Sequence, residues 1–329
     1  MTSELYPLRF KHVYRDYIWG GDKIVRHYDR EEPPGIYAES WEVSTRPEGE
    51  SIIRDGPLEG MPLRELVKTK GAELLGTEVK GDDFPLLIKL IDSKDRLSVQ
   101  VHPDDETAAA YGGEAKTEMW YVLDAEPGAR VYAGLRKGVT EEEFRKAIET
   151  NEFEDILIAV PVSKGDAIFI PGGLVHAIDR GCLLLEVQQN SNTTYRIYDW
   201  GRTGHDGKPR ELHIDEALRV IKWEQEKKPM VEASAIEMPG HNKAWEILAC
   251  PYFRMERFLV TEPMSCHNDG SSFHAIFVAS GEASIGWDDL EIDVSPGTSC
   301  LMPAALKDYT LKHMDVPCEL LRISVPSSL

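Results

Sequence analysis

The chain has 329 residues, of which 42% are hydrophobic and 29% charged, a composition typical of a folded protein and not of a disordered one. Its 57 acidic and 37 basic residues give a net charge of −20, which argues against nucleic acid or an anionic membrane as the main partner. No apolar run approaches the roughly 20 residues of a membrane-spanning helix. The polar N-terminus and five cysteines without a C-x-x-C pair indicate a reduced, cytoplasmic protein.

The length favours about two domains, and the many short apolar runs between glycines and prolines predict a β-rich fold with few helices. Apolar residues at helical spacing predict one helix over 62–75. Thr140 and Glu143 form a capping box that predicts the start of a second helix, and an apolar stripe over 214–221 predicts a third. The charged segment 224–229 is the expected linker, and a solvated loop inside one domain is the alternative.

The expected strands carry polar residues on one face. Strict alternation over 97–102 sends Ser98, Gln100 and His102 to the same side. Three further expected strands each contribute a polar residue: Glu118 in 118–123, Glu186 in 183–189 and Arg196 in 193–200. Polar groups on the inward faces of several strands predict a barrel whose interior holds a site.

One segment pattern occurs twice. The spacing of Gly and Pro in 165–176 recurs in 297–308, and the apolar pattern of 118–131 recurs in 274–287. The offsets are 132 residues (297 minus 165) and 156 residues (274 minus 118), so they differ by 24 residues. That difference is about the length of the capped segment at Thr140. The sequence therefore predicts two copies of one β-unit, with a helical insertion in the first.

Four side chains have the character of metal ligands. Gln100 and His102 point the same way from one strand, Glu118 opens the next strand, and His176 follows the tight turn at 171–173. Imidazole nitrogens and carboxylate oxygens are the donors that a borderline divalent cation takes. Their order along the chain predicts a metal site in the first β-unit.

That order resembles the cupin double-stranded β-helix, and the local sequences resemble the type I mannose-6-phosphate isomerases in their shorter bacterial form. The blocks that carry the resemblance are YRDYIWGG, AESWEVS, LLIKLIDSKDRLSVQVHPDD, KTEMWYVLD, IFIPGGLVHAI and LLEVQQNSNTTYRIYDWGR. The expected fold is mainly β, with two cupin-type double-stranded β-helix (jelly-roll) units and helical insertions. Residues 1–230 would form the catalytic metal-binding domain, and 235–329 a degenerate C-terminal cupin domain without metal.

The resemblance also implies roles for single residues. The implied metal ligands are Gln100, His102, Glu118 and His176. The implied catalytic residues are Arg196, Lys116 and Glu186, and the implied substrate-binding residues are Ser98, Lys89 and Arg202. Gln100 has an alternative role, which is to hydrogen-bond a metal-bound water. The implied cofactor is one Zn²⁺ per chain, although manganese, cobalt or nickel would also suit these donors.

The implied activity is the interconversion of mannose 6-phosphate and fructose 6-phosphate through an enediol, by a monomer or a homodimer. The group that abstracts the proton stays open among Glu186, a ligand histidine, a metal-bound water and Lys116. A cupin metal oxygenase is a second hypothesis, but such enzymes usually carry H-x-H where this chain has Gln100 and His102. A non-catalytic sugar-binding cupin is a third.

The second β-unit differs at the ligand positions. Asp308 stands where the first unit has the distal histidine, and His274 stands where it has the carboxylate. His267 lies upstream and could join them around a cation, but no Q-x-H or H-x-H pair starts the site. The sequence therefore predicts a metal-free second unit.

Overall fold

The computed structural model describes residues 5–204, 206–224 and 228–326, which form two compact units. The central unit comprises Tyr14–Ser40 and Ile88–Val231. The C-terminal unit comprises Glu232–Leu329 together with Met1–Val13 and Trp41–Leu87, apart from the residues outside the described ranges. This division differs from a linear one at residue 230, because two N-terminal segments group with the C-terminal part. Three residues of the expected linker, 225–227, lie outside the described residues.

Two sheets contain the strands of the central unit, and the ends of three of these strands (Val13, Trp41–Val43 and Leu86–Leu87) fall outside its bounds. The larger sheet has, in spatial order, β2 (Val13–Arg15), β3 (Glu39–Val43), β4 (Leu86–Ser93), β11 (Cys182–Gln189), β6 (Glu118–Ala125) and β9 (Ala167–Ile170). The smaller sheet has β12 (Tyr195–Tyr198), β5 (Val99–Val101), β10 (His176–Ile178), β7 (Arg130–Leu135) and β8 (Leu157–Pro161). All recorded pairings in these sheets are antiparallel.

The outer face of the smaller sheet is apolar and covered by helices. Val99 and Val101 of β5 belong to one buried cluster with Phe144 of α5 (Glu141–Glu149) and Ala217 of α6 (Ile214–Val220). Because successive side chains of a strand alternate between its faces, burial of these valines directs Gln100 to the opposite face. The packing of the helices thus sets the direction of the site residues.

The expected helices form, with one break and some additions. Thr140 caps α5 through the predicted box with Glu143. The expected helix over 62–75 is divided into α2 (Leu63–Lys70) and α3 (Ala72–Leu75), because Gly71 adopts a φ of 47°. Three short helices were not predicted from sequence patterns, namely α1 (Lys23–His27), α4 (Asp105–Tyr111) and the 3-10 helix η1 (Phe153–Ile156).

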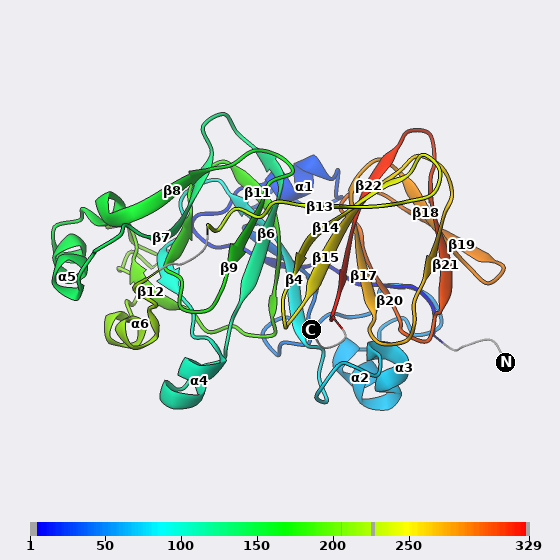
Figure 1. Ribbon diagram of the computed structural model, residues 1–329, viewed down its shortest axis with the longest axis horizontal. Coiled ribbons are helices and arrows are strands. Elements are labelled where there is room, and N and C mark those ends of the chain that lie inside the picture. The colour runs from blue at the N-terminus through cyan, green and yellow to red at the C-terminus, as the bar shows by residue number, and fades with distance from the viewer. Residues whose placement is uncertain (1–4, 205, 225–227, 327–329) are drawn as a thin grey trace. The chain divides into compact units, whose positions relative to one another are not determined.

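Two sheets also build the C-terminal unit. The larger has, in spatial order, β1 (Leu8–Arg9), β20 (Ser299–Met302), β17 (His274–Ser280), β22 (Cys318–Ser324), β15 (Arg254–Val260), β14 (Lys243–Ala249) and β13 (Ser234–Ile236). The smaller has β16 (Met264–His267), β21 (Asp308–His313), β18 (Ala283–Trp287) and β19 (Leu290–Val294). Figure 1 shows β17, β20 and β22 side by side in this unit.

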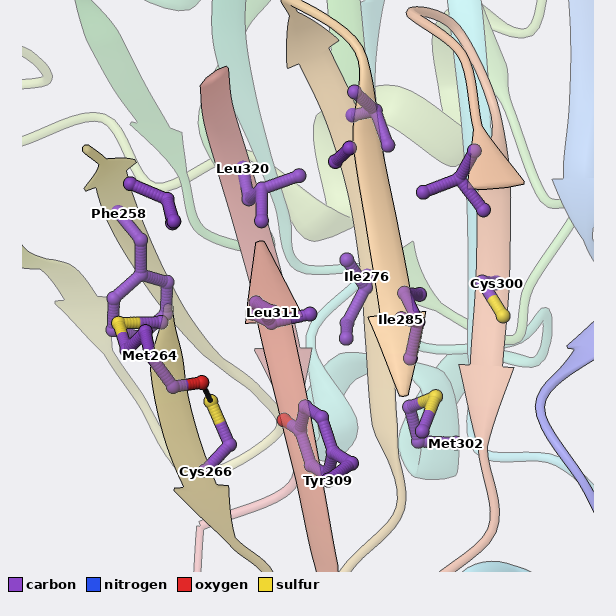
Figure 2. Packing of buried hydrophobic residues seen from close by; sticks show 14 of the residues in the cluster. Phe258, Met264, Cys266, Ile276, Ile285, Cys300, Met302, Tyr309, Leu311 and Leu320 are labelled. Atoms are coloured by element: carbon purple, nitrogen blue, oxygen red, sulfur yellow. Dashed lines mark hydrogen bonds between the residues drawn. The ribbon is translucent and has the colours of Figure 1, made fainter. Parts of the chain in front are cut away.

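The apolar core of the C-terminal unit takes residues from both of its sheets. Figure 2 shows Phe258, Ile276 and Leu320 of the larger sheet near Ile285 and Leu311 of the smaller one. All five belong to one buried hydrophobic cluster. Burying apolar surface between two sheets is the main stabilising contribution in a jelly-roll of this size.

The two units have the same topology, which confirms the predicted repeat. The order β4-β11-β6-β9 in the central unit corresponds to β15-β22-β17-β20, and β5-β10-β7-β8 corresponds to β16-β21-β18-β19. The helical insertion lies between β7 and β8, where the chain forms α5 and η1 (Figure 1). Its counterparts β18 and β19 are joined by only Asp288 and Asp289. The fold is therefore mainly β with two jelly-roll units, as predicted.

Among the described residues, the helices are all too short or too polar to cross a membrane.

Candidate active site

Three fully buried side chains meet in the central unit, namely those of His102, Glu118 and His176. Their ligand atoms all lie within 4.8 Å of one another. His102 Nε2 is 3.5 Å from one carboxylate oxygen of Glu118, and His176 Nε2 is 3.3 Å from the other. Two imidazoles and a carboxylate are a donor set that zinc and similar cations take. Within the described parts of the chain, these residues form the one such group of His, Cys, Asp or Glu side chains.

Strand pairing brings these residues together from distant parts of the sequence. Glu118 opens β6 and pairs with Gln188 of β11. His176 opens β10 and pairs with Gln100 of β5, two residues before His102. The pairing of β5 with β10 therefore places the Q-x-H segment beside the distal histidine.

The turn before β10 fixes the approach of the two histidine segments. Gly173 has a φ of 89° and donates its backbone N–H to the carbonyl of His102 at 2.7 Å. A Cβ on Gly172 would lie 2.6 Å from the Cα of Asp104, which no side chain could tolerate without a shift of the backbone. Glycine at these positions allows the histidine-bearing segments to lie against each other.

The protonation states of the cluster suit a cation. Burial, together with the charge of Lys116, lowers the pKa of His102 to about 3, and burial lowers the pKa of His176. Burial opposes the ionisation of Glu118, but Lys116 and the imidazoles outweigh it and hold the pKa of that carboxyl well below its usual range. His176 Nδ1 lies 2.8 Å from the carbonyl of Leu174, so a proton there leaves Nε2 with its lone pair. Neutral imidazoles and an ionised carboxylate are the forms that bind a metal.

Several buried polar atoms in the cluster lack hydrogen-bond partners. They are both carboxylate oxygens of Glu118, Nδ1 of His102 and Nε2 of His176. The Lys116 ammonium lies 3.0 Å from a carboxylate oxygen of Glu118 and 3.1 Å from His102 Nε2. It forms no hydrogen bond with the Glu118 carboxylate, because the angles are unfavourable. Unpartnered buried polar atoms are rare and call for an explanation. A divalent cation held by His102, Glu118 and His176 fits them.

A cavity of about 290 Å³ lies beside this cluster in the central unit. Its lining includes Ser98, Gln100, Lys116, Lys89, Glu186 and Arg196, which the sequence analysis had all named. His102, Glu118 and His176 are not part of the lining, and Lys116 contacts both the cluster and the cavity. The side chains of Gln100 and Ser98 form no hydrogen bond or ion pair with those of the three clustered residues, although the backbone of Gln100 pairs with that of His176.

A buried ion pair forms part of the cavity wall. Lys89 Nζ is 2.9 Å from Glu186 and 3.3 Å from Glu39. Trp120 donates its indole N–H to Glu186 at 2.7 Å. Burial and the charge of Glu118 raise the pKa of Glu186, while Lys89 opposes that rise. Glu186 is therefore a carboxyl group with an increased tendency to hold a proton.

The arginines near the cavity differ in whether they line it or lie behind its wall. Arg196 lines the cavity and donates to the carbonyl of Glu211 at 2.8 Å. Arg202 is not part of the lining and instead donates to Asp199 at 2.8 and 3.0 Å. Arg210, which the sequence analysis did not select, lines the cavity and also contacts Asp199.

Aromatic and acidic residues of the cavity wall were also missing from the predicted site. Tyr17, Trp19 and Glu39 line it. The signals were present, because these residues lie in or beside YRDYIWGG and AESWEVS. The resemblance identified these blocks but no single residue within them.

Comparisons with known proteins agree with this geometry. The family model "Phosphomannose isomerase type I, catalytic domain" matches residues 7–133, and "Mannose-6-phosphate isomerase, cupin domain" matches residues 244–323. The mannose-6-phosphate isomerase ManA of Bacillus subtilis is 34% identical over 314 residues, which cover 95% of this chain and 97% of that protein. The chain belongs to the type I mannose-6-phosphate isomerase family.

Two further relatives extend the comparison. The mannose-6-phosphate isomerase of Streptococcus mutans is 39% identical over 216 residues, or 65% of this chain and 67% of that protein. The crystal structure of the Bacillus subtilis mannose 6-phosphate isomerase matches with a TM-score of 0.88 and 30% identity over 97% of this chain and 99% of that chain. These matches confirm the cupin fold class, and family membership makes the chain an enzyme of the isomerase class.

Proposed function

We propose that this enzyme interconverts D-mannose 6-phosphate and D-fructose 6-phosphate through an enediol, with a divalent cation held by His102, Glu118 and His176. The observation that carries the proposal is the buried group of two imidazoles and a carboxylate beside a cavity lined by lysine and arginine. The names of the relatives support the choice of substrate.

Two imidazoles and one carboxylate favour zinc, and one Zn²⁺ per chain is the proposed content. When bound, the cation would polarise the substrate oxygens and stabilise the negative charge that develops in the transition state. Gln100 is proposed to complete the site, either as a fourth ligand or through a hydrogen bond to a water there. Its side chain faces the cavity in support of this role.

The side chains of the cavity would handle charge and protons. Isomerisation removes a proton from one carbon and returns it to its neighbour, so the enzyme needs a group that can accept and release a proton. We propose Glu186 for this transfer, because it lines the cavity and its raised pKa brings it closer to neutral pH. Lys116 is the competing candidate. Solvent-deuterium incorporation into the sugar, measured in Glu186→Gln and in Lys116→Met, would show which of the two variants has lost the proton transfer.

Substrate recognition would rely on cations and hydrogen bonds. Lys89 and Arg196 supply positive charge at the cavity, and Ser98 supplies a hydroxyl group. Arg202 is proposed to contribute to the same region through its contact with Asp199. A negatively charged sugar needs such a local cationic cluster in a protein of net charge −20.

The decisive experiment combines metal analysis with a coupled assay for fructose 6-phosphate. We expect one zinc per chain and turnover of mannose 6-phosphate. Oxygen consumption without isomerisation would support a metal oxygenase, and sugar binding without turnover would support a non-catalytic cupin. Either result would contradict the proposal.

We further propose that the enzyme works in the cytoplasm as a monomer or homodimer. All five cysteines are free and buried, which suits a reducing compartment. Sedimentation analysis would determine the oligomeric state.

A further inference from the structure

Three polar residues lie in a row across the smaller sheet of the central unit. Gln100 of β5 pairs with His176 of β10 on one side and with Arg196 of β12 on the other. Residues directly paired in an antiparallel sheet project from the same face. Since neighbouring strands are about 4.8 Å apart, the backbones of His176 and Arg196 are separated by roughly 10 Å. The row therefore runs from the proposed metal site to a guanidinium.

A cluster of arginines surrounds the far end of this row. Arg210 donates to both oxygens of Asp199 at 2.7 and 2.5 Å, and Arg202 donates to the same carboxylate at 2.8 and 3.0 Å. The Asp199 side chain is only 7% exposed, so this carboxylate is a fixed anchor for both guanidiniums. Of the two, only Arg210 is part of the cavity lining, where it joins Arg196.

The cluster has more positive than negative charge. Arg202 and Arg210 share the buried carboxylate of Asp199, whereas Asp199 and Glu211 act on Arg196 only through their charge. The other two acidic side chains are mainly in solvent: Asp95, 3.5 Å from Arg202, is 57% exposed, and Glu211 is 84% exposed. Burial and the charges of Arg210 and Arg202 lower the pKa of Arg196, which shows that its ionised form is poorly compensated. Arg196 Nε is buried without a hydrogen-bond partner. A dianion with several acceptor oxygens would satisfy both needs.

We propose that Arg210 binds the phosphoryl group of the sugar together with Arg196, and that Asp199 is the positioning residue that holds Arg210 in the cavity wall. The phosphoryl group of a hexose 6-phosphate is at the opposite end of the carbon chain from the reacting carbons. The row has the same order, with His176 at the proposed metal site and Arg196 at the opposite end. Arg202 acts through Asp199 and does not touch the substrate. This inference rests on the proposed function, and it adds a contact residue and its support.

The test compares phosphorylated and unphosphorylated substrates in the metal-loaded enzyme. Loss of a charged hydrogen-bonding partner should lower kcat/KM of Arg210→Ala for mannose 6-phosphate by about 10- to 100-fold, mainly through KM. For unphosphorylated mannose, kcat/KM should fall by a much smaller factor, because that sugar lacks the group that Arg210 binds. Arg145→Ala removes an exposed arginine of the same unit and serves as the matched control. Its kinetics should equal those of the wild type.

Asp199 and Arg202 give the second arm. Asp199→Asn should lower the preference for the phosphorylated sugar while turnover of mannose and zinc content persist. A purely structural role would instead reduce the turnover of both sugars alike. Arg202→Ala should have a smaller effect on that preference than Arg210→Ala, and an equal or larger effect would overturn the assignment of Arg210 as the direct contact.

Binding of inorganic phosphate separates this inference from the proposed function. Calorimetry should show weaker binding of inorganic phosphate to Arg210→Ala than to the wild type. If the wild type lacks isomerase activity but shows this difference, the proposed function fails and the anion subsite stands. If the wild type is an active isomerase and Arg210→Ala keeps its KM and its phosphate affinity, the subsite is overturned.

Discussion

The two units of the chain share one strand order but differ in charge at corresponding positions. Glu118 pairs with Ile170 in the central unit, and His274 pairs with Met302 at the same place in the C-terminal unit. Glu186 pairs with the residue two positions after Glu118, and Arg322 pairs with the residue two positions after His274. Arg322 therefore takes the place of Glu186 in the C-terminal unit. A carboxylate pair in one unit is thus replaced by an imidazole and a guanidinium in the other.

At the corresponding positions of the C-terminal unit, His274 and Arg322 both have polar partners. His274 Nδ1 lies 2.9 Å from the hydroxyl of Tyr309, and Arg322 lies 2.7 Å from Glu256 and 4.8 Å from the centre of the Phe258 ring. In the central unit, by contrast, the imidazoles and carboxylate retain unpartnered atoms. The same scaffold therefore supports an open donor set in one unit and a closed polar network in the other.

The remaining ligand positions of the C-terminal unit have moved to the surface. His267 pairs with Asp308, as Gln100 pairs with His176 in the central unit. Their side chains lie 2.8 Å apart, within hydrogen-bonding distance, but they are 66% and 83% exposed. An exposed pair of this kind is a weak basis for a tight metal site. We therefore keep the prediction that this unit functions without metal.

The largest expected effect concerns the metal ligands. His176→Ala should release the zinc and lower isomerase activity by more than about 100-fold, since even changes to residues that support a ligand cost 10- to 100-fold. His274→Ala, the matched change in the C-terminal unit, should retain one zinc per chain and full activity. Metal analysis of both variants would show this. Two zinc ions per chain, with one lost in each variant, would mean that both units kept a site.

Chelation tests the same dependence without mutation. Removal of the metal should abolish isomerase activity, and added zinc should restore it. Full activity in a preparation shown to be free of metal would contradict the role assigned to His102, Glu118 and His176.

The next effect concerns stability of the C-terminal unit. Arg322→Met should lower the free energy of unfolding by about 2–3 kcal/mol, because it leaves the buried carboxylate of Glu256 without its main partner. Adding Glu256→Gln should recover part of that loss. Chemical denaturation measures both variants, and zinc content should not change. An unaltered unfolding midpoint in Arg322→Met would show that this pair does not stabilise the unit.

A smaller effect is expected at Arg196. Arg196→Ala should keep its zinc, because a guanidinium is not a metal ligand, but lose turnover by about 10- to 100-fold. Arg196→Lys should be a poor replacement, since it keeps the charge and loses the planar fork. Steady-state kinetics with parallel metal analysis provides the measurement. Near-normal kcat/KM in the alanine variant would remove Arg196 from the site.

The smallest effect concerns the pH dependence of stability. Burial and the charge of Arg322 lower the pKa of His274 to about 3, against 6.5 for an ordinary histidine. Because the unfolded chain binds this proton more readily, the folded protein should lose stability as pH falls from about 6.5 towards 3. For a side chain that is not fully buried, the loss should be on the order of 1 kcal/mol. His274→Gln should flatten this part of the curve of Tm against pH, and an unchanged curve would contradict the assignment.

Much of the local structure was predictable from short patterns. Alternation around Val99 and Val101 predicted the face of Gln100, and the capping box at Thr140 predicted the start of α5. The order of His102, Glu118 and His176 predicted that they would meet. These signals are local, since strand alternation, helix caps and tight turns depend on neighbouring residues.

Other features depended on contacts between distant segments. Arg210 lies on the loop after β12, and nothing in its own neighbours shows that Asp199 would direct it to the cavity. The grouping of Trp41–Leu87 with the C-terminal segment likewise rests on long-range contacts, such as the backbone bond from Thr77 to Gly270. Sequence patterns determined which elements form and which faces are polar. The tertiary structure decided which charged groups meet, because only folding brings distant segments together. The pKa of a buried group depends on the neighbours that it gains in this way.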